Sequence, residues 1–171
     1  MKRRKTSMKS AACRLAILVS SLLFLQAASA DKAVEPNANG IIEFVDKADG
    51  GKPVSVRITL RHPNATDKTE DNDWWGAFDK VPDRIISKVE IKVGSEAVEL
   101  FRSAYADLGD VRQVDIKNAR DHFTLIIHGG ETGTGYTAEL LFKDGYMVSR
   151  QVTHNEMGLE EKTEYFPVRD N

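Results

Sequence analysis

Apolar residues alternate with polar residues along much of the chain after residue 40. In residues 54–60, the apolar positions are Val54, Val56, Ile58 and Leu60, and the polar ones are Ser55, Arg57 and Thr59. Because successive side chains of a β-strand point to opposite faces, this pattern predicts a strand with one buried and one solvated face. The same period of two predicts strands at residues 89–93, 123–127 and 136–142.

Shorter apolar runs and turn sequences complete the expected fold. Further strands are expected at residues 41–45, 98–101, 111–116, 146–152 and 163–166. Asp49-Gly50-Gly51, Gly94-Ser95 and Lys143-Asp144-Gly145 separate neighbouring runs, and such sequences favour hairpins because glycine adopts the positive φ that tight turns need. Residues 103–108 predict one helical turn, capped by Ser103 and ended by Gly109. The sequence therefore predicts an all-β fold, an antiparallel β-sandwich or partly open barrel of about eight to nine short strands with one helical turn.

One expected strand carries a charged residue on its apolar face. By alternation, Arg150 shares a face with Tyr146, Val148 and Val152. A buried arginine needs a carboxylate or carbonyl partner. Because arginine is rarely fully buried, we expect Arg150 near a sheet edge, with its head in water.

The first 30 residues have the three parts of a cleavable secretory signal peptide. A head with six basic residues and no acidic one precedes an apolar run at residues 15–25, and Ala28-Ser29-Ala30 offers a cleavage site. The apolar run is shorter than the roughly 20 residues of a membrane-spanning helix. We therefore expect an exported protein, periplasmic or secreted, without an integral membrane segment after cleavage. A short flexible lead-in is expected at residues 31–39 and a single β-sandwich domain at residues 40–171.

Loss of the leader changes the charge and the cysteine content of the chain. The residues that remain include 18 basic and 26 acidic ones, a formal net charge of −8. This charge disfavours nucleic acids and anionic membranes as partners and favours a cationic protein. Cys13, the single cysteine, lies in the leader, so the exported domain is expected to be free of disulfides.

Residue spacing provides no catalytic or metal-binding motif. His122 and His128 lie about 20 Å apart along one expected strand at 3.3 Å per residue, so they cannot share a metal ion. The chain has no Gly-x-Ser-x-Gly sequence and no cysteine after residue 30. We expect no metal, no cofactor and no catalytic residues, although carboxylates that converge only in the folded chain stay possible as an acid–base pair.

Two loops stand out as candidate binding elements. The first, residues 70–78 (EDNDWWGAF), carries Trp74 and Trp75 among carboxylates. Adjacent side chains of an extended segment point in opposite directions, so one tryptophan is expected near the surface. There it suits a sugar, a cationic partner or a protein interface. The alternative is that the tryptophans plug the open end of the sandwich.

The second loop, residues 128–136 (HGGETGTGY), has four glycines. Its small side chains and exposed amides suit a partner's backbone or an anion, and the alternative is an ordinary glycine-rich hairpin connection. Thr132-Gly133-Thr134-Gly135-Tyr136 resembles the Ser-Gly-x-x-Tyr motif of bacterial periplasmic lysozyme inhibitors, with threonine in place of serine. In that family the motif lies in a loop that enters the lysozyme active site. The resemblance, which covers five residues, implies Thr132, Gly133 and Tyr136 as contact residues.

Three functions follow as alternatives. The first is an exported, non-catalytic binding or accessory domain whose ligand is a cationic protein or a glycan, with Trp74, Trp75, Thr132, Gly133 and Tyr136 as the candidate binding residues. The second is inhibition of a cationic lysozyme-like enzyme. The third is hydrolysis of an envelope polymer by a pair of carboxylates. The first requires the two loops to lie at the same end of the sandwich and to form one surface, and the second rests on the glycine-rich loop and the negative charge.

Overall fold

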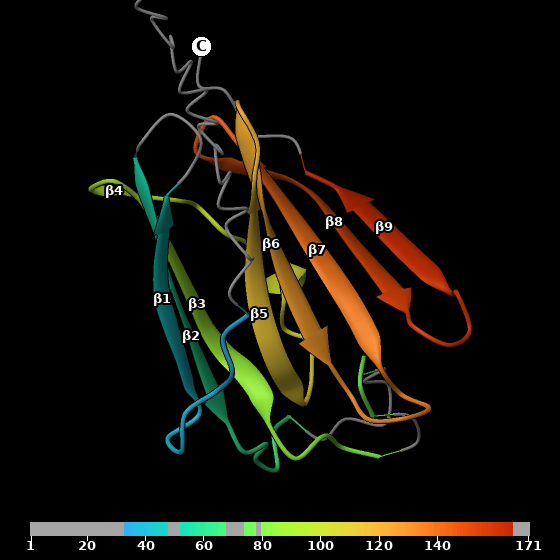
Figure 1. The fold of residues 1–171 in the computed structure, drawn as a ribbon. Coiled ribbons are helices and arrows are strands. Elements are labelled where there is room, and N and C mark those ends of the chain that lie inside the picture. The colour runs from blue at the N-terminus through green and yellow to red at the C-terminus, as the bar shows by residue number, and fades with distance from the viewer. Residues whose placement is uncertain (1–32, 48–51, 68–73, 78–79, 166–171) are drawn as a thin grey trace, which may run out of the picture.

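The protein is built from two antiparallel β-sheets (Figure 1). The computed structural model describes residues 33–47, 52–67, 74–77 and 80–165. The first sheet contains β1 (Ile41–Lys47), β2 (Pro53–Arg61), β3 (Ile85–Val93) and β4 (Glu96–Ala97). The second contains β5 (Val111–Asn118), β6 (His122–Gly129), β7 (Tyr136–Lys143), β8 (Tyr146–His154) and β9 (Glu160–Glu164). A short 3₁₀ turn, η1 (Arg102–Ala104), lies between the sheets in the sequence.

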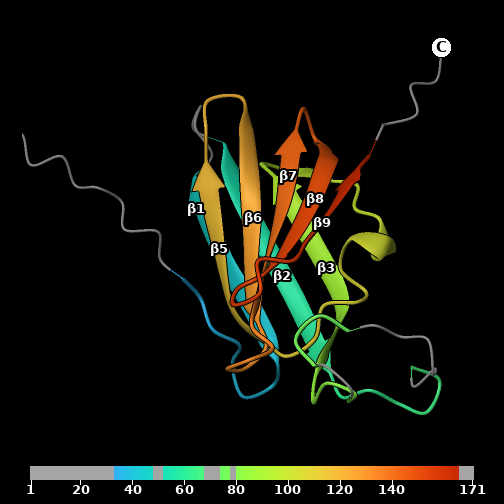
Figure 2. The same cartoon turned by 90° about the vertical axis from the view of Figure 1, so that its right-hand side faces the viewer.

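Both sheets follow the order of the chain, so each strand pairs with its sequence neighbour. The chain passes from the first sheet to the second through residues 98–110. Figure 2 shows the two layers and the helical turn of this connection beside β3. On the opposite side, Asn118 of β5 donates to the Asp46 carboxylate of β1 at 3.0 Å, which joins the two sheets.

One apolar core fills the space between the sheets. The alternating positions of β2, namely Val54, Val56, Ile58 and Leu60, are at most 5% exposed, and those of β7, namely Tyr136, Ala138, Leu140 and Phe142, are fully buried. Residues of both sheets belong to a single buried cluster. The prediction of an all-β antiparallel fold is confirmed, and the nine strands of the described residues match the expected number.

The predicted hairpin between β7 and β8 is also confirmed. Lys143 pairs with Tyr146, which leaves Asp144 and Gly145 as a two-residue turn. Both have positive φ values, 53° and 84° respectively, as this class of turn requires.

Residues 98–101 do not form the expected strand, and this prediction is wrong. The pairing of β3 with β4 stops soon after Ala97, because the chain leaves the edge of β3 to cross toward the second sheet; Glu99 already bridges Tyr146 of β8. The expected cap of the helical turn is wrong as well. Phe101 is the residue before the turn, and no side chain caps it.

A β-bulge changes the face that Tyr146 occupies. The register between β7 and β8 shifts between Leu141 and Phe142, so that Met147, not Tyr146, is buried at the start of β8. Tyr146 is 46% exposed and does not share the inner face of Arg150, contrary to the simple alternation.

The segment before β1 is attached to the second sheet. Val34, within the expected lead-in, exchanges two backbone hydrogen bonds with Val114 at 2.9 and 3.0 Å, which attaches this segment to the edge of β5. The expected signal peptide lies outside the described residues. None of the described helices has the length and apolar character needed to span a membrane.

Candidate functional site

Residues 107–110 (Asp-Leu-Gly-Asp) form the support on which the loops at one end of the sandwich rest. This segment precedes β5, and Asp110 has a φ of 48°. Asp110 is fixed to Arg84 by two bonds, because its amide donates to the Arg84 carbonyl at 2.8 Å and its carboxylate accepts from the Arg84 amide at 3.0 Å. We call this stretch the supporting segment.

The described part of the tryptophan loop, residues 74–77, pairs with the supporting segment. Trp75 donates its amide to Asp107 O at 3.0 Å, and its carbonyl accepts from the Gly109 amide at 3.0 Å. Gly76 follows with a φ of 95°, and a Cβ at this position would lie 2.7 Å from the Gly109 carbonyl oxygen. Such a close approach requires glycine.

The glycine-rich loop rests on the same segment. The Gly130 amide donates to Asp110 O at 3.1 Å, and the Gly130 Cα lies against Gly76, since a Cβ added to either residue would come within 3.3 Å of the other's Cα. The two loops therefore lie side by side at one end of the sandwich, as the first functional alternative requires.

Tyr136 is the buried anchor of this arrangement. Its side chain is fully buried, its hydroxyl donates to the Gly109 carbonyl at 3.0 Å, and its ring lies 6.4 Å from that of Trp75. Burial raises the pKa of Tyr136 well above its ordinary value, and the nearby Asp107 and Asp110 carboxylates act in the same direction. Tyr136 therefore lies beneath the surface and not on it.

Arg150 connects the second sheet to the supporting segment. Its side chain is 2% exposed, and its guanidinium donates to Asp107 at 2.5 Å, to Glu161 at 2.6 Å and to the Ala104 carbonyl at 3.2 Å. The expectation that its head lies in water is wrong, because the connection between the sheets covers this face of β8 and supplies two partners, Ala104 and Asp107, while β9 supplies Glu161. Burial raises the pKa of Asp107, and the attraction of Arg150 acts in the opposite direction.

A third loop, residues 155–159 between β8 and β9, was not singled out from the sequence. The Asn155 amide donates to Gly135 O at 2.9 Å, and the Gly133 amide donates to the Glu156 carboxylate at 2.8 Å, so this loop lies against the glycine-rich loop. Both loops are at the lower right of Figure 1. Met157 and Leu159 are 55% and 56% exposed. The sequence feature that marks this loop is the pair of apolar residues, Met157 and Leu159, on either side of Gly158 within an otherwise polar turn sequence.

Residues 74–77, 130–135 and 155–159 together make what we call the three-loop surface. Of the candidate residues, Thr132 and Gly133 are exposed at the tip of the glycine-rich loop, and Trp74 and Trp75 are half-buried. Trp75 also packs against the core. This contact agrees in part with the alternative in which the tryptophans close the open end of the sandwich. The remaining tryptophan-loop residues, 70–73 and 78, lie outside the described residues.

Several backbone amides of the glycine-rich loop donate hydrogen bonds to groups of the same chain. Besides the amides of Gly130 and Gly133, the Glu131 amide donates to the Thr134 hydroxyl and the Thr134 amide to Glu131 O, both at 2.9 Å. The Gly133 amide already holds a carboxylate of the same chain, that of Glu156. This favours contact through exposed side chains over capture of an anion by the loop backbone.

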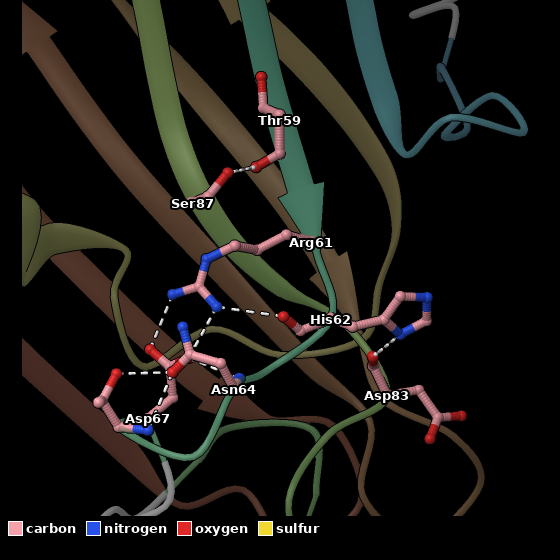
Figure 3. A network of polar contacts seen from close by, with 8 residues as sticks. Thr59, Arg61, His62, Asn64, Asp67, Asp83 and Ser87 are labelled. Atoms are coloured by element: carbon pink, nitrogen blue, oxygen red, sulfur yellow. Dashed lines mark hydrogen bonds and ion pairs between the residues drawn. The ribbon is translucent and has the colours of Figure 1, made fainter.

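A polar network at the end of β2 holds the chain as it leaves the first sheet (Figure 3). Arg61 forms a two-pronged contact with Asp67, with both N–O distances 2.7 Å, and His62 Nδ1 lies 2.8 Å from Asp83 O. The Arg61 contact lowers the pKa of Asp67 to about 2, and the Asn64 amide contributes in the same direction. The network fixes residues 61–67, which precede the tryptophan loop.

On the outer face of the second sheet, Thr137, His128 and Asp115 lie next to one another in the order of the nucleophile, base and acid of a catalytic triad. His128 Nδ1 lies 3.1 Å from the Thr137 hydroxyl, and His128 Nε2 lies 3.6 Å from Asp115. The Thr137 hydroxyl, however, donates to Asn155 Oδ1 at 2.9 Å. Its hydrogen therefore points away from the imidazole, which cannot act as its general base in this arrangement. The series is a cross-strand polar contact.

The described residues contain no group of three or more histidine, cysteine or acidic side chains arranged to hold a metal ion. Comparison of the chain with protein-family models, with curated proteins and with solved structures finds no match.

Proposed function

We propose that this protein is an exported, non-catalytic binding domain that presents the three-loop surface to a cationic protein. The observation that carries the proposal is the convergence of three loops from different parts of the chain, two of which rest on the supporting segment while the third lies against the glycine-rich loop. Loops held by a rigid scaffold are a common way to build a binding surface.

The composition of the surface supports a protein partner. Met157 and Leu159 are exposed apolar side chains of this surface, and Trp74 and Trp75, in another of its loops, are half-buried. Apolar and aromatic anchors contribute most of the binding energy of many protein interfaces.

The charge of the surface supports a cationic partner. Residues 74–77, 130–135 and 155–159 include Glu131 and Glu156 and contain no lysine, arginine or histidine, and Glu160 is the next residue in the chain. The ion pair of Glu131 with Arg112 is 3.5 Å long, and both side chains are at least 60% exposed. Because such a pair is weak, it leaves the carboxylate available to a basic surface.

Hen egg-white lysozyme, a small basic protein, is a suitable first probe, and calorimetry with the purified protein tests the proposal. We expect binding at micromolar or lower concentration, and we expect Leu159→Asp and Glu131→Lys each to weaken it by about tenfold or more. The matched controls are Val45→Asp, at an exposed apolar residue of β1, and Glu90→Lys, at an exposed glutamate of β3. Equal losses in the control variants, or no binding to this or other basic proteins, would contradict the proposal.

Inhibition of a lysozyme-like enzyme is the second candidate function. It is favoured by one observation: Thr132 and Gly133 are exposed at a loop tip, while Tyr136 fixes the base of the loop. Contact would then be made by the first two residues of the motif and not by the tyrosine side chain. Loss of lytic activity on mixing, restored by Thr132→Arg, tests this candidate, and unchanged lysis with a panel of lysozymes rejects it.

The hydrolase alternative has weaker support. Asp107 and Glu161 are carboxylates that the fold does bring together, but both pair with the buried Arg150. An acid–base pair needs one carboxyl that protonates the leaving group and another that activates water, and a shared arginine hinders both roles.

Export is the remaining part of the proposal and has its own test. We expect the protein purified from its cells to begin at Asp31 when its N-terminus is sequenced. A protein that begins at Met1 would contradict cleavage after Ala30.

A further inference from the structure

A pocket of about 410 Å³ opens between the two sheets at the end of the sandwich opposite the three-loop surface. The turns between β5 and β6 and between β7 and β8, which border it, are at the top of Figure 2. Its volume is within the usual range for small-molecule sites, about 300–1,000 Å³.

The floor of the pocket is apolar and aromatic. Phe123 of β6 and Phe142 of β7 stack with ring centroids 4.8 Å apart and an interplanar angle of 11°. They are 6% and 0% exposed, so the floor is part of the core and is held in place by it. Val93 and Val98 extend this apolar lining on the side of the first sheet.

The rim of the pocket is polar and balanced in charge. Three basic side chains and three acidic ones surround it: Lys52, Arg120 and Lys143, and Glu96, Asp121 and Asp144. Asp121 accepts from Lys143 and from His122, each at 2.8 Å. A ligand of one charge would therefore meet like charges as well as opposite ones. A neutral ligand with many hydroxyl groups could accept from the cations and donate to the carboxylates.

An exposed aromatic residue follows this rim directly in the sequence. Tyr146, the residue after the lining residue Gly145, is 46% exposed, and its backbone bridges Glu99, the residue after the lining residue Val98. Exposed aromatic faces suit the apolar C–H face of a sugar ring.

We propose that this pocket, with Tyr146 beside it, binds a short neutral carbohydrate. Sugar rings have both kinds of surface that this pocket can bind. Their C–H faces pack against aromatic side chains, and their hydroxyls form hydrogen bonds with the basic and acidic side chains of the rim. The site is separate from the three-loop surface, so a protein partner and a glycan could bind at the same time.

Titration of the ¹⁵N-labelled protein with trisaccharides tests the proposal by NMR. The probes are the neutral trisaccharides chitotriose, cellotriose and maltotriose. Decanoate and spermine are titrated separately, as an anionic and a cationic alternative ligand. We expect at least one trisaccharide to shift the amide signals of Ala119, Arg120 and Gly145 at millimolar concentration. No shift at these amides with any trisaccharide, or shifts with decanoate or spermine alone, overturns the proposal.

Variants at exposed positions separate binding from folding. We expect Tyr146→Ala to weaken trisaccharide binding by about tenfold, or about 1.4 kcal/mol, because the variant removes the aromatic face on which a sugar ring would stack. Tyr146→Phe keeps the ring and should retain binding, and Glu43→Ala, at an exposed position of β1 outside both surfaces, should have no effect. Equal affinity of Tyr146→Ala and the unaltered protein would overturn the role of Tyr146. A failed trisaccharide titration leaves the lysozyme-binding experiment unaffected, since the two sites are at opposite ends.

Discussion

The guanidinium of Arg150 lies 2.5 Å from the carboxylate of Asp107, 43 residues earlier in the chain. This contact joins strand β8 to the supporting segment, and the second contact of Arg150, with Glu161, adds strand β9. The segment on which the tryptophan loop and the glycine-rich loop rest is therefore held to the second sheet by an ion pair with a buried guanidinium as well as by backbone pairing.

Replacement of Arg150 by methionine is expected to destabilise the protein strongly. The change leaves Asp107, whose side chain is 33% exposed, without its cationic partner. Removal of one partner of a buried pair costs about 3–5 kcal/mol of unfolding free energy, and the partial exposure of Asp107 places the expected loss at the lower end of this range. Urea unfolding followed by circular dichroism measures the loss. Arg57→Met is the control, because Arg57 pairs with Glu43 on the surface, where such pairs contribute about 0–1 kcal/mol. Similar losses for both variants would show that the Arg150 pair has no special role.

The contact between the first two loops depends on Gly76. In Gly76→Ala the new Cβ would lie 2.7 Å from the Gly109 carbonyl oxygen, at a φ of 95°, so the tryptophan loop must move away from the supporting segment. Gly133→Ala is a matched control, since Gly133 also has a positive φ, 84°, but its Cβ would meet no atom within 4 Å. We expect the control to lose about 1 kcal/mol of stability from backbone strain alone.

Tryptophan fluorescence distinguishes the two glycine variants. Gly76→Ala should shift the emission of the native protein to longer wavelength, because Trp75 becomes more exposed, whereas Gly133→Ala should leave it unchanged. An unshifted spectrum for Gly76→Ala would mean that the loop tolerates the added methyl group.

Alternation in the sequence was sufficient to identify most strands, because a strand with one buried face repeats its pattern over the whole element. It failed at two places where the backbone departs from regular pairing. The bulge opposite Phe142 turned Tyr146 outward, and the departure of the chain from β3 ended the expected strand at residues 98–101.

The candidate site was less predictable, because its geometry depends on contacts between distant residues. Glycines in the sequence identified both loops as candidate binding elements. No local sequence pattern predicts that Trp75 pairs with Leu108 or that the Tyr136 hydroxyl donates to the Gly109 carbonyl. The side chain of Tyr136 was expected to contact a partner, yet its place on the apolar face of β7, with Ala138 and Leu140, already indicated burial.

Tyr136→Phe isolates the hydroxyl of this anchor. The variant leaves the buried Gly109 carbonyl without its donor, for which we expect a loss of about 1–3 kcal/mol. Because burial raises the pKa of Tyr136 well above its ordinary value, its hydroxyl should stay protonated while exposed tyrosines ionise. Ultraviolet titration of the native protein and of Tyr136→Phe should therefore give the same ionisation curve near pH 10. A smaller absorbance change in the variant would contradict the burial of the hydroxyl.

The Arg61–Asp67 contact predicts a specific dependence of stability on pH. Because the pKa of Asp67 falls from 3.8 to about 2 in the folded protein, its carboxylate stabilises the fold fully above the unfolded value and loses this contribution as the pH falls toward the folded value. The difference in unfolding free energy between the unaltered protein and Asp67→Asn should therefore shrink between about pH 5 and pH 2. Asp121→Asn, at the opposite end, should behave in the same way, since Lys143 and His122 lower the pKa of Asp121 to about 2. Urea unfolding across this range measures both differences, and a difference that stays constant for Asp67→Asn would mean that Arg61 does not hold the ionised carboxylate in solution.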